Sequence, residues 1–340
     1  MTPLTACKLT SHLTCHRFAV LGGDTRMRYV AERLSEAGCP VVLCGCGGKC
    51  LPCEEKDGAI TLCASPERAV EAATDIVLPL PASRDGETVS VPRDPGCHIP
   101  LSALFDTVER REDLCLYGGC LPEAAMTGLS PSARLRVTDY YESEALQIRN
   151  ALITAEGAIM RAMELTDCML EGSTVAVIGY GRIGRFLCRR LLSLGADVTL
   201  VARREEALLY AEAEGCRPLR LGDSRRAGGG LYPLCYGHSV IFNTVPAQVF
   251  DRELLMRMER DTLLLDLASA PFCASDDDIR EAGMAGTIRY VRAPSLPGSY
   301  APRDAGHIIA ACILDEICRR QREKDHREAE NTRGGVKGEA

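Results

Sequence analysis

The segment that most restricts the fold of this chain is TVAVIGYGRIGRFLCRRLLSLGADVTLVAR, residues 174–203. It contains an apolar strand, a turn with glycines at Gly179, Gly181 and Gly184, a helix, and a second apolar strand. A buried strand that enters a helix through such a turn is typical of a doubly wound α/β unit with a parallel sheet. The segment therefore predicts such a unit in the second half of the chain.

The spacing of the three glycines indicates what the turn can bind. Gly179 permits a tight turn, Gly181 lets a pyrophosphate approach the backbone, and Gly184 lets the helix pack closely on the strand. The helix N-terminus adds N–H donors and the positive end of a dipole. Glycines used only for packing are the alternative. The pattern predicts dinucleotide contacts from Gly179, Tyr180, Gly181, Arg182, Ile183 and Gly184.

The end of the next strand predicts which dinucleotide fits. An acidic residue at this place holds the ribose 2′-hydroxyl of NAD, whereas arginine accommodates the 2′-phosphate of NADP. The strand here ends with Arg203 and Arg204, and the first carboxylate after it belongs to Glu205. We therefore expect NADP as the cofactor, with two solvated arginines at a helix start as the alternative.

The rest of the chain also alternates apolar runs with amphipathic stretches. The predicted strands are 18–23, 41–44, 75–81, 114–119, 239–243, 262–268 and 287–291. The predicted helices are 24–36, 67–73, a long connection over 141–165, 205–214, 250–258, 276–283 and 306–318, with a Pro/Gly-rich loop at 293–302. The fold class expected is α/β, with two Rossmann-like doubly wound parallel-sheet domains.

Four segments follow from this pattern. We expect an N-terminal Rossmann-like substrate or partner domain over 1–150 and an NADP-binding Rossmann domain over 151–303. A closing helix over 304–324 and a disordered, charged tail over 325–340 complete the chain.

Several polar residues are expected at the carboxyl ends of the strands, where an open parallel sheet binds ligands. The expected nicotinamide-side contacts are Asn243, Thr244, Val245, Pro246 and Ser269. The expected substrate contacts are Arg26, Ser295 and Ser299, with Arg303 as the alternative clamp. A guanidinium can hold a carboxylate through two parallel hydrogen bonds.

The composition excludes several other classes. Forty basic against 47 acidic residues give a net charge of −7 without a basic stripe, so a nucleic-acid partner is not expected. No apolar run reaches the length of a membrane span, and we expect a soluble, cytoplasmic protein. No hydrolase nucleophile elbow is present, and His307 fits a packed helix histidine better than a general base.

The chain has 18 cysteines, five of them between Cys39 and Cys53. Their CxC and CxxC spacings could ligate zinc or an iron–sulfur cluster. No second CxxC or histidine pair completes a standard ligand set, and we expect no bound metal.

Several of these segments together resemble the A subunits of dipicolinate synthase, over residues 17–318. The resemblance lies in GGDTR (22–26), DIVLPLP (75–81), NALITAEGAIMRAMELTD (150–167), VAVIGYGRIG (175–184), NTVPAQV (243–249), DLAS (266–269) and LPGSYAPRDAGHII (296–309). The sequence differs from the usual Pro-Gly-Gly after DLAS, because Phe272 and Cys273 follow Pro271.

The resemblance implies an NADP-dependent oxidation of dihydrodipicolinate to pyridine-2,6-dicarboxylate during endospore formation, on a branch of the lysine/diaminopimelate pathway. It also implies a partner, a flavoprotein-like B subunit, and we expect an oligomer. The substrate is dihydrodipicolinate or its hydroxylated tetrahydro precursor. Two alternatives stay open: another NAD(P)-dependent dehydrogenase of a small carboxylic acid, such as an alanine-dehydrogenase-like enzyme, and a non-catalytic dinucleotide-binding subunit.

Overall fold

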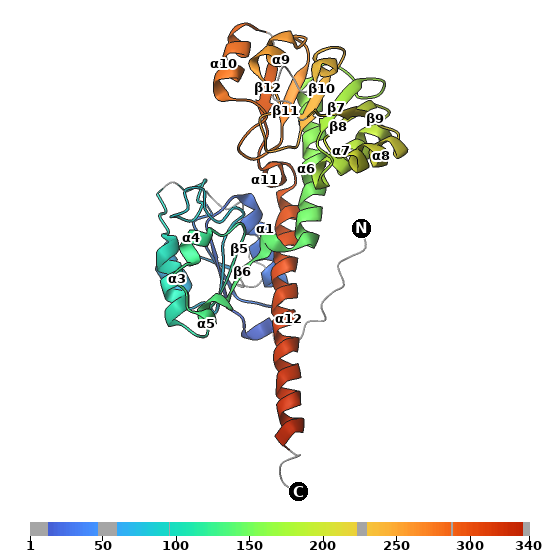
Figure 1. Ribbon diagram of the computed structural model, residues 1–340. Coiled ribbons are helices and arrows are strands. Elements are labelled where there is room, and N and C mark those ends of the chain that lie inside the picture. The colour runs from blue at the N-terminus through green and yellow to red at the C-terminus, as the bar shows by residue number, and fades with distance from the viewer. Residues whose placement is uncertain (1–12, 47–59, 95, 223–229, 287, 336–340) are drawn as a thin grey trace. The chain divides into compact units, whose positions relative to one another are not determined.

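The computed structural model describes residues 13–46, 60–94, 96–222, 230–286 and 288–335. The chain divides into two compact units, each of which contains one sheet (Figure 1). Unit 1 comprises the chain up to Gln147 together with the segment from Pro302 onward, and unit 2 is Ile148–Ala301. The sequence predicts divisions after residues 150 and 303, and the closing helix that it predicts over 304–324 lies in unit 1.

Unit 1 is built on a six-stranded parallel sheet of order β3-β2-β1-β4-β5-β6, the strand order of a Rossmann fold. The strands are β1 Phe18–Leu21, β2 Val41–Cys44, β3 Ile60–Leu62, β4 Asp75–Val77, β5 Cys115–Gly118 and β6 Val137–Asp139. The helices are α1 Thr25–Glu36, α2 Pro66–Glu71, α3 Leu101–Arg110, α4 Glu123–Met126, α5 Pro131–Arg134 and α12 Pro302–Gly335. The 3₁₀ turns η1 Leu13–Cys15 and η2 Tyr140–Glu142 belong to the same unit.

Unit 2 repeats this architecture with the order β12-β11-β10-β7-β8-β9. Its strands are β7 Thr174–Ile178, β8 Asp197–Ala202, β9 Arg217–Arg220, β10 Val240–Asn243, β11 Leu263–Asp266 and β12 Arg289–Arg292. Its helices are α7 Arg182–Ser193, α8 Glu205–Ala213, α9 Arg252–Arg257, α10 Asp276–Met284 and α11 Leu296–Tyr300, with η4 at Tyr232–Cys235. The helix α6, Glu144–Leu165, contains the boundary between the units.

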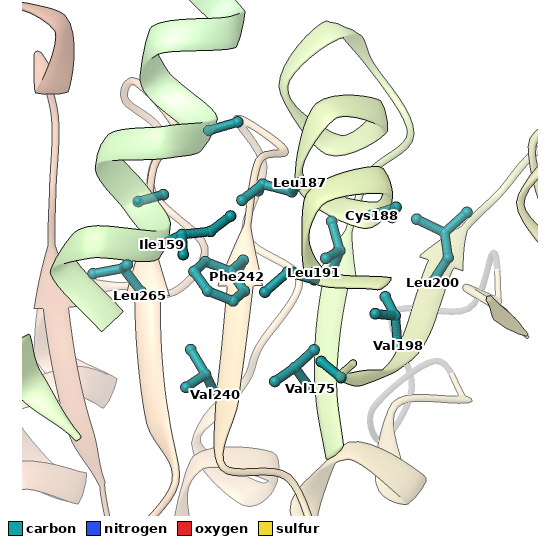
Figure 2. Close-up of a cluster of buried hydrophobic side chains, with 14 of the residues drawn as sticks. Ile159, Val175, Leu187, Cys188, Leu191, Val198, Leu200, Val240, Phe242 and Leu265 are labelled. Carbon is teal, nitrogen blue, oxygen red and sulfur yellow. The ribbon is translucent and has the colours of Figure 1, made fainter. Parts of the chain in front are cut away.

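The sheet of unit 2 is buried on both faces, and its central strands β7, β10 and β11 are apolar at every position except Thr174, Asn243 and Asp266. Val175 and Val177 point to one face, where α6 and α7 cover them, and Figure 2 shows Ile159 and Leu187 in this cluster. Ala176 belongs to the cluster on the opposite face. Successive side chains of a strand alternate between faces, so a continuous apolar run is what a doubly covered strand requires.

The structure confirms the predicted fold class and most of the predicted elements, with differences at the sheet edges. The strands β3, β6 and β9 were not predicted, because they are short and only partly buried. The strand predicted over 75–81 ends at Val77, since prolines follow it. The predicted loop at 293–302 contains the short helix α11.

The disordered tail predicted from residue 325 is wrong for the residues up to Gly335, where α12 continues. Side chains three or four positions apart on this helix pair with each other. Arg319 pairs with Glu316 and Glu323, Arg320 pairs with Glu316, and Gln321 donates to Asp325 at 2.8 Å. Such pairs each add about 0.2–0.5 kcal/mol to an exposed helix. Within the described residues, no helix is long and apolar enough to cross a membrane.

The packing of α12 on α1 gives a testable prediction for unit 1. Gly306 of α12 is buried, and a Cβ atom there would collide with the backbone carbonyl of Arg26 and with the Tyr29 side chain. We expect Gly306→Ala to lower the free energy of unfolding by about 1–3 kcal/mol through overpacking. The measurement is urea unfolding followed by circular dichroism.

Gly283→Ala is the matched control, because Gly283 lies in helix α10 and an added Cβ atom there would meet nothing within 4 Å outside the helix's own backbone. Alanine is the better helix former, so this change should leave stability unchanged or raise it by up to about 1 kcal/mol. Equal effects of the two substitutions would show that α12 does not pack on α1 as described.

Candidate functional site

The glycine turn after β7 has the geometry that its sequence predicts. Gly179 adopts a φ of +97°, and a Cβ there would lie 2.5 Å from Thr244 Oγ1. A Cβ on Gly184 would collide with the carbonyl oxygen of Gly179, so α7 packs directly on the turn. At Gly181, by contrast, nothing lies within 4 Å of the Cβ position. The turn therefore leaves open space where a pyrophosphate approaches the backbone in Rossmann dinucleotide sites.

The first turn of α7 is suited to an anion. Gly181 is the N-cap residue and provides no side-chain hydrogen bond to the helix. The first turn of the helix contains no acidic residue, and Arg182 is exposed there. Helix N-termini of this kind bind phosphates through backbone N–H groups and the helix dipole. These residues fit the pyrophosphate of a dinucleotide.

The side chain of Tyr180 turns away from this open space. Its ring is buried in the core of unit 2, and its hydroxyl donates to Glu214 Oε2 at 2.9 Å. Burial and this hydrogen bond raise the pKa of Tyr180 above its ordinary value. Ile183 also packs on the core. Both residues therefore shape the turn, and any contact of Tyr180 with a cofactor comes from its backbone.

A cluster of arginines lies at the carboxyl end of β8. Arg203 and Arg204 are exposed directly after this strand. Arg220, at the end of the neighbouring strand β9, pairs with Glu205 and donates from Nη1 to the Arg203 carbonyl at 3.1 Å. Arg220 lies outside the predicted site residues, because β9 is too short and polar to be predicted from the sequence. The structure thus adds a third guanidinium to the predicted pair.

Asn243 and Thr244 organise the turn after β10. Asn243 is fully buried, and its Nδ2 donates to Asp266 Oδ1 at 2.8 Å and to the Val245 carbonyl at 3.0 Å. Thr244 Oγ1 donates to the Ile178 carbonyl at 2.8 Å and so ties this turn to the end of β7. Asn243 therefore positions the turn, while Val245 is half-buried and Pro246 is exposed beside it.

The buried carboxylate of Asp266 joins three segments at this edge of the sheet. Oδ1 accepts hydrogen bonds from Asn243 Nδ2 and from the Ala268 amide, at 2.8 and 3.2 Å. Oδ2 accepts from the Cys273 amide at 2.8 Å and from the Tyr290 hydroxyl at 3.0 Å. Four donors satisfy this carboxylate, as a buried charge requires. These hydrogen bonds fix the loop on which Ser269 is exposed. The sequence alone did not predict this role of Asp266.

Arg26 in unit 1 is largely buried and already has partners. Its Nε and Nη2 donate to the carboxylate of Asp24 at 2.8–3.1 Å, and Nη2 also donates to the Leu80 carbonyl at 2.6 Å. Partial burial would raise the pKa of Asp24, but the hydrogen bonds and charge of Arg26 outweigh it and hold this pKa below its ordinary value. A role of Arg26 in substrate binding stays a prediction. In that role the Nη1 atom would donate to the substrate, because Nε and Nη2 already donate to Asp24 and Leu80.

The other expected substrate residues are exposed. Ser295 is the N-cap residue of α11 with a φ of +59°, and Ser299 Oγ donates to the Leu296 carbonyl at 3.2 Å. Arg303 is exposed on the first turn of α12. Ser295 and Ser299 lie in unit 2, whereas Arg26 and Arg303 lie in unit 1. Their joint action on a substrate stays a prediction.

The corresponding turn of unit 1, at Gly22 and Gly23, is covered by the chain itself. A Cβ on Gly22 would lie 2.8 Å from Val89 Cγ1 and 2.9 Å from the Ser90 carbonyl oxygen. The Gly23 amide donates to that same carbonyl at 2.7 Å, and Asp24 caps the helix that follows. Val89 and Ser90 occupy the space that a phosphate would need, and the Gly23 N–H group already has a partner. This turn therefore lacks the open space found at Gly181 in unit 2.

Two further expectations concern histidine and cysteine residues. His307 is half-buried on α12, its ring meets that of Tyr29 edge-on at 6.3 Å, and burial lowers its pKa. In the patch over Cys39 to Cys53, Cys50 and Cys53 lie outside the described residues. Among the residues that are described, no three metal-ligating side chains cluster. The absence of a metal stays a prediction.

Two parallel sheets in Rossmann order, one with an open glycine turn, define a two-unit protein with an oxidoreductase-type, dinucleotide-binding fold. Residues 17–141 match the family model for the N-terminal domain of the dipicolinate synthase A subunit, and residues 175–227 match the TrkA-N domain. The dipicolinate synthase A subunit of Bacillus subtilis (strain 168) is 28% identical over 92% of this chain and 99% of its own length. Over nearly its whole length the chain is therefore similar to dipicolinate synthase A subunits.

Solved structures show the same similarity. The crystal structure of the dipicolinate synthase A subunit from Bacillus halodurans matches with a TM-score of 0.73 and 26% identity, over 90% of this chain and 98% of that one. An L-alanine dehydrogenase matches with a TM-score of 0.56 and 14% identity over 88% of each chain, which shows a shared fold alone.

The glycine turn yields a prediction that separates binding from folding. Gly181 has a φ of −80°, so alanine fits its backbone, but the added methyl group occupies the open space. We expect Gly181→Ala to leave the free energy of unfolding within about 0.5 kcal/mol and to weaken dinucleotide binding at least about tenfold. Isothermal titration with NADPH measures the affinity.

Gly184→Ala is the companion change, because its methyl group would collide with the turn itself. It should lower both the stability, by about 1–3 kcal/mol, and the affinity. Unchanged affinity in Gly181→Ala would contradict the placement of the pyrophosphate.

Proposed function

We propose that this chain is the NADP-dependent oxidoreductase subunit of a dipicolinate synthase, which oxidises dihydrodipicolinate to pyridine-2,6-dicarboxylate during endospore formation. The observation that carries the proposal is the open glycine turn of unit 2 beside three arginines, in a chain that is similar to dipicolinate synthase A subunits. The cofactor is NADP, because the 2′-phosphate needs positive partners and Arg203 and Arg204 stand at its expected place.

The reaction needs orientation more than acid–base chemistry. Loss of a hydride and a proton turns the dihydropyridine ring into an aromatic pyridine, and the stability of that ring drives the step. The oxidised nicotinamide supplies the hydride acceptor. The chain's own part is to hold the reacting carbon near that acceptor, and the loop fixed by Asp266, with Ser269 exposed on it, suits this task.

The substrate carries two carboxylates, and each needs a fixed polar partner when water is removed. In this proposal Arg26 contributes the Nη1 side of its guanidinium, while the hydroxyls of Ser295 and Ser299 bind the substrate as well. Arg303 is the alternative clamp. The ion pair with Asp24 then holds the Arg26 guanidinium in one orientation before substrate arrives.

A partner protein belongs to the same proposal, since the name of the B. subtilis relative makes it one subunit of a synthase. We propose that the partner is a flavoprotein-like B subunit, with a cytoplasmic location and an oligomeric assembly. Turnover with pyruvate and ammonia would instead favour an alanine-dehydrogenase-like enzyme. NADPH binding without any turnover, even with the B subunit present, would favour a non-catalytic subunit.

The proposed cofactor preference gives a direct prediction for Arg203. Replacing Arg203 by alanine removes a charged hydrogen-bond partner of the 2′-phosphate. We expect NADP binding to weaken by about 1–3 kcal/mol, while NAD binding is nearly unchanged. Titration of both cofactors into the parent protein and the variant is the test, and equal affinities of the parent for NADP and NAD would overturn the assignment.

The proposed clamp gives a prediction for Arg26. Arg26→Ala should reduce dipicolinate formation about a hundredfold while NADPH affinity stays intact, because transition-state contacts are lost and the cofactor site is not. Arg26→Lys is the companion variant, since it keeps a positive charge beside Asp24 and loses the planar fork. Near-full activity of stably folded Arg26→Ala with the B subunit would move the clamp to Arg303.

A further inference from the structure

Two exposed ion pairs lie at opposite ends of strand β9, one to a residue of β8 and the other to the first residue of α8. Arg217 pairs with Asp197 at their amino ends. Arg220, at the carboxyl end of β9, pairs with Glu205 of α8, and Ala202 at the carboxyl end of β8 is in register with Arg220. The carboxyl ends form the ligand-binding edge of a parallel sheet. Both pairs join an arginine to a carboxylate, but one lies at the amino ends of the strands and the other at their carboxyl ends.

Glu205 stands at a critical place for cofactor choice. It is the first carboxylate after β8, and it begins α8 directly behind Arg203 and Arg204. A carboxylate at this edge accepts hydrogen bonds from the ribose 2′-hydroxyl of NAD and repels the 2′-phosphate of NADP. An unpaired Glu205 would therefore oppose the preference that the two arginines create.

We propose that Arg220 sets the NADP preference of this chain by neutralising Glu205, and that it acts as a positioning residue through this ion pair. The inference rests on the proposed NADP site. Arg220 binds Glu205 through Nη2, and its Nη1 donates to the Arg203 carbonyl at 3.1 Å. One guanidinium thus removes the competing negative charge and anchors the backbone that carries Arg203.

The ion pair between Arg220 and Glu205 is exposed to solvent, and this determines whether it affects stability or cofactor binding. The side chains of Arg220 and Glu205 are 54% and 60% exposed, and ion pairs so exposed contribute little to folding stability. The charges still act on an anion bound within a Debye length, about 8 Å at physiological ionic strength. Loss of Arg220 should therefore change cofactor binding without unfolding the unit.

The experiment measures dissociation constants for NADPH and NADH by titration of the full chain. Arg220→Gln should weaken NADPH binding about tenfold and tighten NADH binding about two- to threefold, because Glu205 is released. Adding Glu205→Gln to Arg220→Gln should restore NADPH binding to within about threefold of the parent and abolish the gain for NADH. Raising the salt concentration should reduce the difference between the parent and Arg220→Gln.

Two controls match this design. Arg217→Gln removes the same type of side chain from the same strand, at the opposite edge, and should leave both dissociation constants unchanged. Adding Glu206→Gln to Arg220→Gln removes the neighbouring carboxylate, which is not the partner of Arg220, and should restore little NADPH affinity.

The outcomes separate this inference from the proposed function. Equal affinities of the parent protein for NADPH and NADH would contradict both the proposed function and this inference. A parent that prefers NADPH, with Arg220→Gln unchanged, keeps the NADP site and overturns the role of Arg220. Weakened NADPH binding that Glu205→Gln does not restore would show that Arg220 contacts the cofactor itself, and would also overturn the neutralising role.

Discussion

The close approach of α7 to the end of β7 is the constraint on which the site of unit 2 depends. Gly184 meets the carbonyl of Gly179 with no room for a side chain, and Thr244 contacts Gly179 from the turn after the neighbouring strand β10. This contact aims the N-terminus of α7 at the open space beside Gly181. A helix dipole is useful to an anion only within its first turn, so the packing of two glycines creates the electrostatic site.

A buried network of hydrogen bonds around Asp266 fixes the loops that follow the neighbouring strands of this sheet. Asp266 takes four hydrogen bonds and joins the turn after β10, its own loop and Tyr290 of β12. Unsatisfied buried donors are costly, so this network holds one loop conformation rather than several. Unit 1 has the same strand order, but there Ser90 accepts from the Gly23 amide and covers the equivalent turn. One fold thus has an open turn in one unit and a covered turn in the other.

The sequence predicted those parts of the fold that local pattern determines. Apolar runs identified the central strands, and the glycine spacing identified the turn at Gly179–Gly184. The edge strands and their residues were missed, Arg220 among them, because short polar strands have no periodic signal. The hydrogen bonds of Asn243 to Asp266 and of Arg26 to the Leu80 carbonyl could not be predicted either, since each joins residues far apart in sequence. Asn243 is fully buried and shapes the turn, and its contact with a cofactor stays a prediction.

The central claim is that unit 2 binds NADPH at the glycine turn while the turn of unit 1 does not. Amide hydrogen exchange with and without NADPH tests it directly, because bound phosphates protect the N–H groups that they contact. We predict slower exchange over residues 179–184 and 203–205, with no change over 22–26. Protection at 22–26, or none at 179–184 under saturating NADPH, would contradict the account.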